Sequence, residues 1–109
     1  MELIEYLFKF IPMLITLQFE IYPVQRGENN TLHGFVYTPD GKPADIQEFR
    51  VTVALPSAGV EPIDTPMAIL DTHGLGPVNF PLPGEWKITF VIRTSEIDQA
   101  TVSTVVNVP

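Results

Sequence analysis

A run of alternating apolar and polar residues after a proline–glycine corner constrains the fold of this chain more than any other feature. The run covers residues 85–93, where Trp86, Ile88, Phe90 and Ile92 share one parity. Because successive side chains of a strand point to opposite faces, this spacing places a large apolar set on one face. That face must be covered, and the single tryptophan is the largest side chain available for burial. The sequence therefore predicts a strand at the centre of a β-sandwich.

Six further segments show strand patterns and are separated by turn residues. They cover residues 14–21, 31–37, 49–55, 63–71, 78–82 and 100–108. Pro66 interrupts one of them, which predicts an edge strand because proline cannot donate into a central ladder. Seven short strands about ten residues apart are typical of an immunoglobulin-like fold. We therefore predict an all-β, seven-stranded antiparallel immunoglobulin-like β-sandwich over residues 14–109. Its expected core contains Phe19, Phe49, Val51, Trp86 and Phe90.

Residues 1–13 are predicted to form a separate apolar segment before the sandwich. Leu3, Leu7 and Ile11 fit one face of a short amphipathic helix, whereas Tyr6 and Phe8 also alternate as in a strand. Both interpretations stay open, with the helix preferred. The segment is shorter than the roughly 20 apolar residues that a membrane-spanning helix needs. An apolar face with few charges favours contact with a partner or with a membrane surface.

Charge and motif content exclude several functional classes. Thirteen acidic and six basic residues give a formal net charge of −7, which opposes binding to a nucleic acid backbone. The chain has no cysteine, which rules out disulfides and thiol catalysis. It also lacks a glycine-rich phosphate loop, a His-Glu-x-x-His motif and a recognisable nucleophile with its base. We therefore expect no enzymatic activity.

Two stretches in the second half of the chain carry a resemblance to a known family. They are Leu-Pro-Gly-Glu-Trp at residues 82–86 and Arg-Thr-Ser-Glu-Ile-Asp-Gln-Ala-Thr-Val at residues 93–102. Shorter matches at residues 30–33, 36–43 and 53–56 extend the similarity over residues 14–108. The chain resembles the carboxy-terminal extracytoplasmic domain of bacterial copper-transport and copper-resistance membrane proteins of the D type (CopD-like), which is related to YtkA-like domains.

The resemblance implies an immunoglobulin-like domain on the outer face of the bacterial cytoplasmic membrane or in the periplasm. It also implies association with a membrane protein and a link to copper, and it implies no catalytic residues. Copper favours imidazole and thioether ligands, which His33, His73, Met13 and Met67 could supply. The expected topology places the two histidines at opposite poles, so they should not meet. Met67 is expected about 10 Å from His33, one strand away. No convergent His/Met copper site is therefore predicted.

A second candidate site lies at one pole of the predicted sandwich, where three loops should gather. These loops carry Asp40, Asp71 with His73, and Glu96 with Asp98. Four carboxylates around one imidazole would repel one another, and a metal cation or a cationic partner would relieve that repulsion. In the alternative interpretation, Asp40 and Asp98 bond the backbone of their own turns and Glu96 is simply solvated. The opposite pole, with the turn at residues 26–27 and the corner at residues 81–84, is expected to be architectural.

Two functional classes fit these observations. In the first, the chain is a non-enzymatic extracytoplasmic accessory or binding module of a copper-handling or other membrane complex. In the second, it is a purely structural interaction subunit of a membrane complex that binds no metal. Copper binding and the identity of the membrane partner would separate the two classes.

Overall fold

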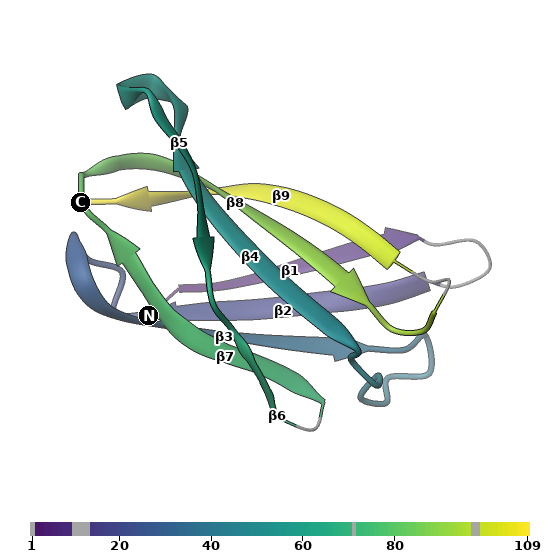
Figure 1. Cartoon of the computed structure of the whole chain (residues 1–109). Helices are drawn as coiled ribbons and strands as arrows, with labels where there is room; N and C mark the ends of the chain where they lie inside the picture. Colours follow the sequence, from purple (N-terminus) through teal and green to yellow (C-terminus); the bar gives the residue numbers. More distant parts are fainter. Residues whose placement is uncertain (1, 10–13, 71, 97–98) are drawn as a thin grey trace.

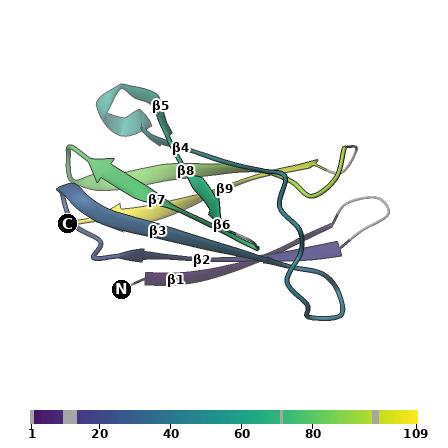
Figure 2. The same cartoon turned by 60° about the horizontal axis from the view of Figure 1, so that its bottom comes forward.

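Two antiparallel β-sheets pack face to face in the computed structural model, which describes residues 2–9, 14–70, 72–96 and 99–109. The predicted all-β sandwich is thus confirmed. The five-stranded sheet has the order β1 (Glu2–Lys9), β2 (Leu14–Tyr22), β3 (Gly27–Tyr37), β7 (His73–Phe80) and β6 (Ala68–Leu70). The four-stranded sheet has the order β5 (Val60–Thr65), β4 (Glu48–Leu55), β8 (Gly84–Arg93) and β9 (Gln99–Val108). A 3-10 turn, Pro56–Ala58, joins β4 to β5. Figures 1 and 2 show the two layers from two directions.

The described residues form nine strands rather than the predicted seven, and two segments explain the difference. Residues 2–9 form β1, which pairs with β2 from Glu2↔Ile21 to Lys9↔Leu14. The preferred amphipathic helix for this segment was therefore wrong, and the strand alternative is the one found. A helix this short is marginal by itself, whereas the exposed edge of β2 offers a ladder of backbone partners.

The predicted edge strand over residues 63–71 is instead two strands in different sheets. Pro66 lies between β5, which pairs with β4, and β6, which pairs with β7. The chain thus crosses from the four-stranded sheet to the five-stranded sheet at this proline, in front of the sandwich in Figure 1. Proline ends one ladder because it lacks the N–H group that would continue it.

The inward faces of both sheets form one continuous core. Its largest fully buried side chains are Trp86, Phe19, Phe80 and Phe90. Phe49 and Val51 are buried as predicted. The indole N–H of Trp86 donates to the carbonyl oxygen of Leu82 at 2.8 Å, so the ring has a polar partner despite full burial.

Leu82 itself was expected to continue the alternation of β7, but β7 ends at Phe80 and the Leu82 side chain is 43% exposed.

Phe49 packs against two glycines that face each other across neighbouring strands. Gly34 of β3 is paired with Gly74 of β7, and both backbones lie under the Phe49 ring. A Cβ atom at Gly74 would come within 2.6 Å of the ring, and one at Gly34 would overlap it. The ring therefore occupies space that any other residue at these two positions would fill.

The loops gather at two ends of the sandwich. The β3–β4 connection and the β8–β9 connection lie at one end, with the start of β7. The start of β1, the β2–β3 turn and the end of β9 lie at the other end. Within the described ranges, no helix has the length and apolarity needed to cross a membrane.

Replacing the central tryptophan tests the importance of this core. We expect Trp86→Ala to lower the free energy of unfolding by about 3–5 kcal/mol, because it leaves a large cavity and an unpaired carbonyl at Leu82. The matched control is Tyr22→Ala, since the Tyr22 side chain is 61% exposed and its removal should cost less than about 0.5 kcal/mol. Urea unfolding followed by circular dichroism measures both. Equal losses for the two variants would contradict a core centred on Trp86.

Candidate functional site

A groove opens where the chain crosses between the sheets. It has a volume of about 540 Å³, which lies within the usual range for small binding sites. One wall is β5 of the four-stranded sheet, and the other is formed by β7 and the start of β3. The groove exists because β6 has only three residues and pairs with β7 only from Leu70↔His73 to Ala68↔Leu75. Beyond that point the edge of β7 continues without β6 beside it (Figure 1).

A buried asparagine fixes one end of the groove. The Asn30 side-chain amide donates to the carbonyl oxygens of Gln25 at 2.9 Å and Gly27 at 3.1 Å, and its side-chain oxygen accepts the Gln25 backbone N–H at 2.9 Å. These three bonds hold the β2–β3 turn closed. They also fix Asn29, which adopts a left-handed φ of 70°, beside the groove. Asparagine tolerates this conformation better than most residues.

The groove lining combines apolar contact surface with negative charge. Asn30, Thr65 and Val78 are buried lining residues. Glu28, Asn29, Ile63, Asp64 and Asn79 also line the groove and are exposed. Among the described lining residues none is basic, so the two carboxylates give the groove a net negative charge. The arrangement suits a ligand that presents an apolar surface together with a cationic or hydrogen-bond-donating group.

Sequence reasoning did not find this groove. The expected topology predicts an architectural role for the end of the molecule where the β2–β3 turn lies, and the groove extends towards that turn. The consecutive asparagines at positions 29 and 30 were one available signal, because buried asparagine commonly organises a loop. The other signal was Pro66, which marks the sheet crossing that leaves the groove open.

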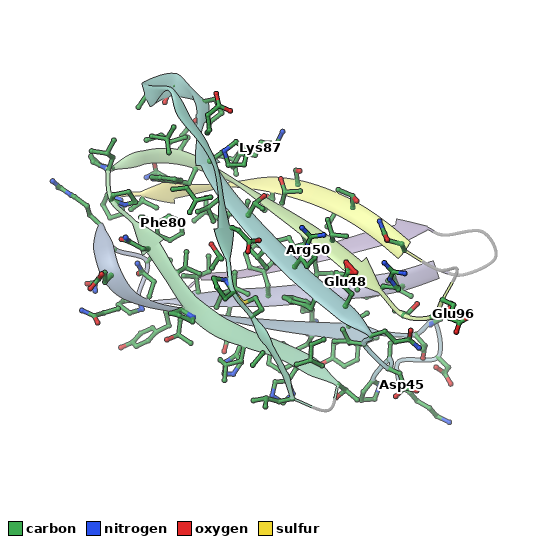
Figure 3. All side chains as sticks on the ribbon, viewed as in Figure 1. Asp45, Glu48, Arg50, Phe80, Lys87 and Glu96 are labelled. Carbon is green, nitrogen blue, oxygen red and sulfur yellow. The ribbon has the colours of Figure 1, made fainter. Side chains whose placement is uncertain are left out.

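The predicted acidic pole is only partly described by the structure. Asp40, His73 and Glu96 belong to the end that the topology predicted, and Figure 3 shows Glu96 there together with Asp45. Asp71 and Asp98 lie outside the described residues. Among the residues that the structure does describe, no three His, Asp or Glu side chains are placed to hold a metal ion. A binding site at this pole therefore stays a prediction.

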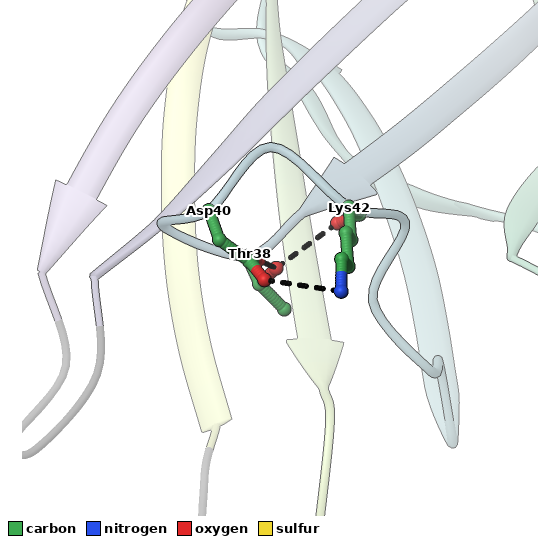
Figure 4. Close-up of polar contacts among 3 residues, drawn as sticks. All are labelled: Thr38, Asp40 and Lys42. Atoms are coloured by element: carbon green, nitrogen blue, oxygen red, sulfur yellow. Dashed lines mark hydrogen bonds and ion pairs between the residues drawn. The ribbon is translucent and has the colours of Figure 1, made fainter.

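Asp40 has its polar partners within its own turn (Figure 4). Its carboxylate accepts a hydrogen bond from the Thr38 hydroxyl and lies 3.8 Å from the Lys42 ammonium. The turn is closed by backbone bonds from Thr38 N–H to the Lys42 carbonyl at 2.8 Å and from Gly41 N–H to the Thr38 carbonyl at 2.9 Å. The Thr38 hydroxyl is the main cause that lowers the pKa of Asp40, with smaller contributions from Lys42. This turn geometry agrees with the alternative interpretation of Asp40 as a turn residue.

Removing the Thr38 hydroxyl should shift the Asp40 titration. The folded-state pKa of Asp40 lies below the ordinary 3.8, so its stabilising contribution is present above that value and is lost as pH falls through the lowered pKa. We expect Thr38→Val to raise the pKa of Asp40 towards its ordinary value. Carboxyl-detected NMR titration measures the change, with Thr52→Val on β4 as the control. An unchanged Asp40 titration in Thr38→Val would contradict the assigned hydrogen bond.

The two histidines lie next to each other, contrary to the sequence-based expectation. The ring centroids of His33 on β3 and His73 on β7 lie 5.8 Å apart. The Phe35 ring centroid lies 5.7 Å from that of His33 and 5.6 Å from that of His73. The pairing Phe35↔His73 brings them together on the outer face of the five-stranded sheet. Glu20 on β2 places a carboxylate oxygen 3.5 Å from His33 Nδ1. The expectation was wrong because β7 begins at His73, whereas the sequence pattern predicts a loop at this residue.

Met67, one of the two methionines considered with these histidines, does not join them. Met67 packs against the core beside Gly76, on the inner side of the sheet. Met13 lies outside the described residues. Among the described residues, Glu20 on the outer face is the carboxylate that lies beside the histidine pair.

Comparisons with known proteins support the fold and leave the function open. No protein-family model matches the sequence, and no curated protein matches it. A similar solved structure is the crystal structure of a DUF4785 family protein from Legionella pneumophila, with a TM-score of 0.65 and 14% sequence identity. The match covers 86% of this chain and 28% of that protein, so this chain spans less than a third of its length. At this identity the likeness shows a common sandwich fold.

Proposed function

We propose that this chain is a non-enzymatic binding module of a larger assembly, and that its groove receives a cationic segment of a partner protein. The resemblance to CopD-like and YtkA-like domains supports an immunoglobulin-like module outside the cytoplasmic membrane, associated with a membrane protein. The groove between β5 and β7 is the observation that carries the binding role. Its volume, the apolar residues in its lining and its two carboxylates together suit one or two basic side chains of an extended segment.

The chemistry of the groove supports a basic partner in particular. Glu28 and Asp64 lie on different walls, so a lysine or arginine side chain between them would meet a carboxylate on either side. The exposed Ile63 side chain and Pro77 offer apolar surface to the aliphatic stem of such a residue. The overall charge of −7 would also steer a basic segment towards this chain.

A short basic peptide tests this proposal. The probe is an acetylated peptide of about eight residues that alternates lysine and valine, which is long enough for one strand. Titration followed by NMR should shift the amide signals of groove residues such as Asn29, Asp64 and Asn79. We expect the double variant Glu28→Gln, Asp64→Asn to bind about two- to thirtyfold more weakly, because each of the two exposed ion pairs contributes roughly 0.2–1 kcal/mol.

A matched control removes the same amount of charge at the other end of the molecule. Asp45→Asn with Glu96→Gln neutralises two exposed carboxylates that lie far from Phe80 and the groove end of β7 in Figure 3. This variant should bind the peptide as the parent protein does. If it binds more weakly while the groove variant is unchanged, the acidic pole is the binding surface. If the peptide shifts no groove signal at all, the structural-subunit alternative is favoured.

Copper binding is a second candidate function, favoured by the proximity of His33 and His73. Imidazole is a good copper ligand, and the 5.8 Å centroid separation places two imidazoles within reach of one ion after a modest ring rotation. Glu20 adjoins the pair and could supply an oxygen ligand. These three side chains do not form a metal site in the arrangement described, so binding would require them to reorient.

Titration with Cu(II) tests this second function. We expect binding tighter than about 1 μM in the parent protein and at least tenfold weaker binding in His33→Asn with His73→Asn, since both imidazoles would be lost. Calorimetry measures the affinity, and the control is Met67→Leu, which leaves the outer face intact. Histidine variants are preferable to deletion of residues 1–13, because residues 2–9 form an edge strand of the sheet. Equal copper affinity in all variants would exclude the histidine pair.

A further inference from the structure

The outer edge of β9 differs from the other sheet edges of this molecule. β9 runs unbroken for ten residues and pairs with β8 from Gly84↔Val108 to Arg93↔Gln99 without a register shift. In the part of the chain that the structure describes, it is the last strand of its sheet. No further described strand pairs with its other side, where an edge strand carries backbone N–H and C=O groups that its own sheet does not use. Such a row is a template for pairing with another strand.

The three other edge strands among the described residues carry features that oppose pairing. β1 contains Glu2, Glu5 and Lys9, so charged residues are distributed along it. β5 contains Glu61, Pro62 and Asp64, and its ladder with β4 is irregular. β6 has only three residues. Charge, proline, irregular pairing and shortness are the usual means by which proteins protect sheet edges.

β9 carries none of these protections. Its sequence, Gln-Ala-Thr-Val-Ser-Thr-Val-Val-Asn-Val, has no charged residue and no proline, although the chain has 19 charged residues in 109 positions, 13 acidic and 6 basic. Valine and threonine dominate it and both favour strands. Val105 faces outward and is 56% exposed, with Thr101, Ser103 and Asn107 exposed on the same face.

We propose that β9 pairs antiparallel with β9 of a second copy of this chain. The four-stranded sheets of the two copies would then join into one continuous sheet across a two-fold axis. In a two-fold pair, β9 of one copy lies beside β9 of the other. A charged residue near the axis would therefore face the same charge on the second copy. For a chain of net charge −7, an uncharged edge is where two copies can meet with the least repulsion. The proposal is independent of the groove and of the histidine pair.

The oligomeric state tests this proposal directly. Sedimentation measurements over about 10 μM to 1 mM should show a monomer–dimer equilibrium, because a single pair of strands buries less surface than a tight interface. Val105→Glu should weaken association about tenfold by adding like charges across the axis. The variant should still fold, since position 105 is paired with Lys87 on the outer face of the monomer. Tyr22→Glu adds the same charge at an exposed site on the other sheet and should dimerise like the parent.

The absence of native cysteine allows the geometry of the pair to be measured with spin labels. Single cysteines at Thr101, Ser103, Val105 and Asn107 carry one label each. In an antiparallel two-fold pair, moving the label by two residues along β9 away from the axis changes the label-to-label distance by about 13 Å. A constant distance would contradict antiparallel pairing. A monomer at every concentration, association that Val105→Glu leaves unchanged, or growth beyond a dimer would each overturn the proposal.

Discussion

The packing of Phe49 over the Gly34–Gly74 pair is the contact on which the arrangement of the sheets depends. The ring comes from β4 of one sheet and lies on the backbone of β3 and β7 in the other, where a side chain at either glycine would collide with it. The Phe49 ring also meets the Phe90 ring edge-on, with their centroids 6.0 Å apart. The Phe90 ring centroid in turn lies 4.8 Å from that of Phe19 in the opposite sheet. The contact therefore joins β4 to β3 and β7 and continues into the centre of the core. It requires a bulky ring and two glycines from distant parts of the sequence.

The same local arrangement has consequences on the outer face. Because side chains alternate along a strand, inward glycines at positions 34 and 74 leave positions 33, 35 and 73 facing outward. The three aromatic rings His33, Phe35 and His73 consequently stand side by side with centroids 5.6–5.8 Å apart. The pairing that admits Phe49 to the core thus also creates the imidazole pair outside. One register determines both features, and a shift by one residue would destroy both.

The sheet crossing at Pro66 explains the groove and the differences among the edges. By leaving the four-stranded sheet after β5 and joining the five-stranded sheet as a three-residue β6, the chain covers only part of the β7 edge. The uncovered part borders the groove between the sheets, which combines apolar surface with two carboxylates. On this side of the molecule, charge and proline protect the strand edges. On the opposite side β9 is long and uncharged and is the last described strand of its sheet, so the two sides have different capacities for interaction.

The all-β class, most strand positions and the central core are predictable from the local sequence pattern, because alternation with a period of two is a local property of the chain. Trp86, Phe90, Phe49, Val51 and Phe19 are buried as that pattern predicts. The strand partners, the registers and the groove depend on contacts between distant parts of the chain. Whether residues 2–9 became a helix or a strand depended on the free edge of β2, and whether His33 met His73 depended on the register of β3 with β7. The groove likewise required a change of sheet at Pro66. Strand partners and registers arise from contacts between distant residues, which local patterns do not encode.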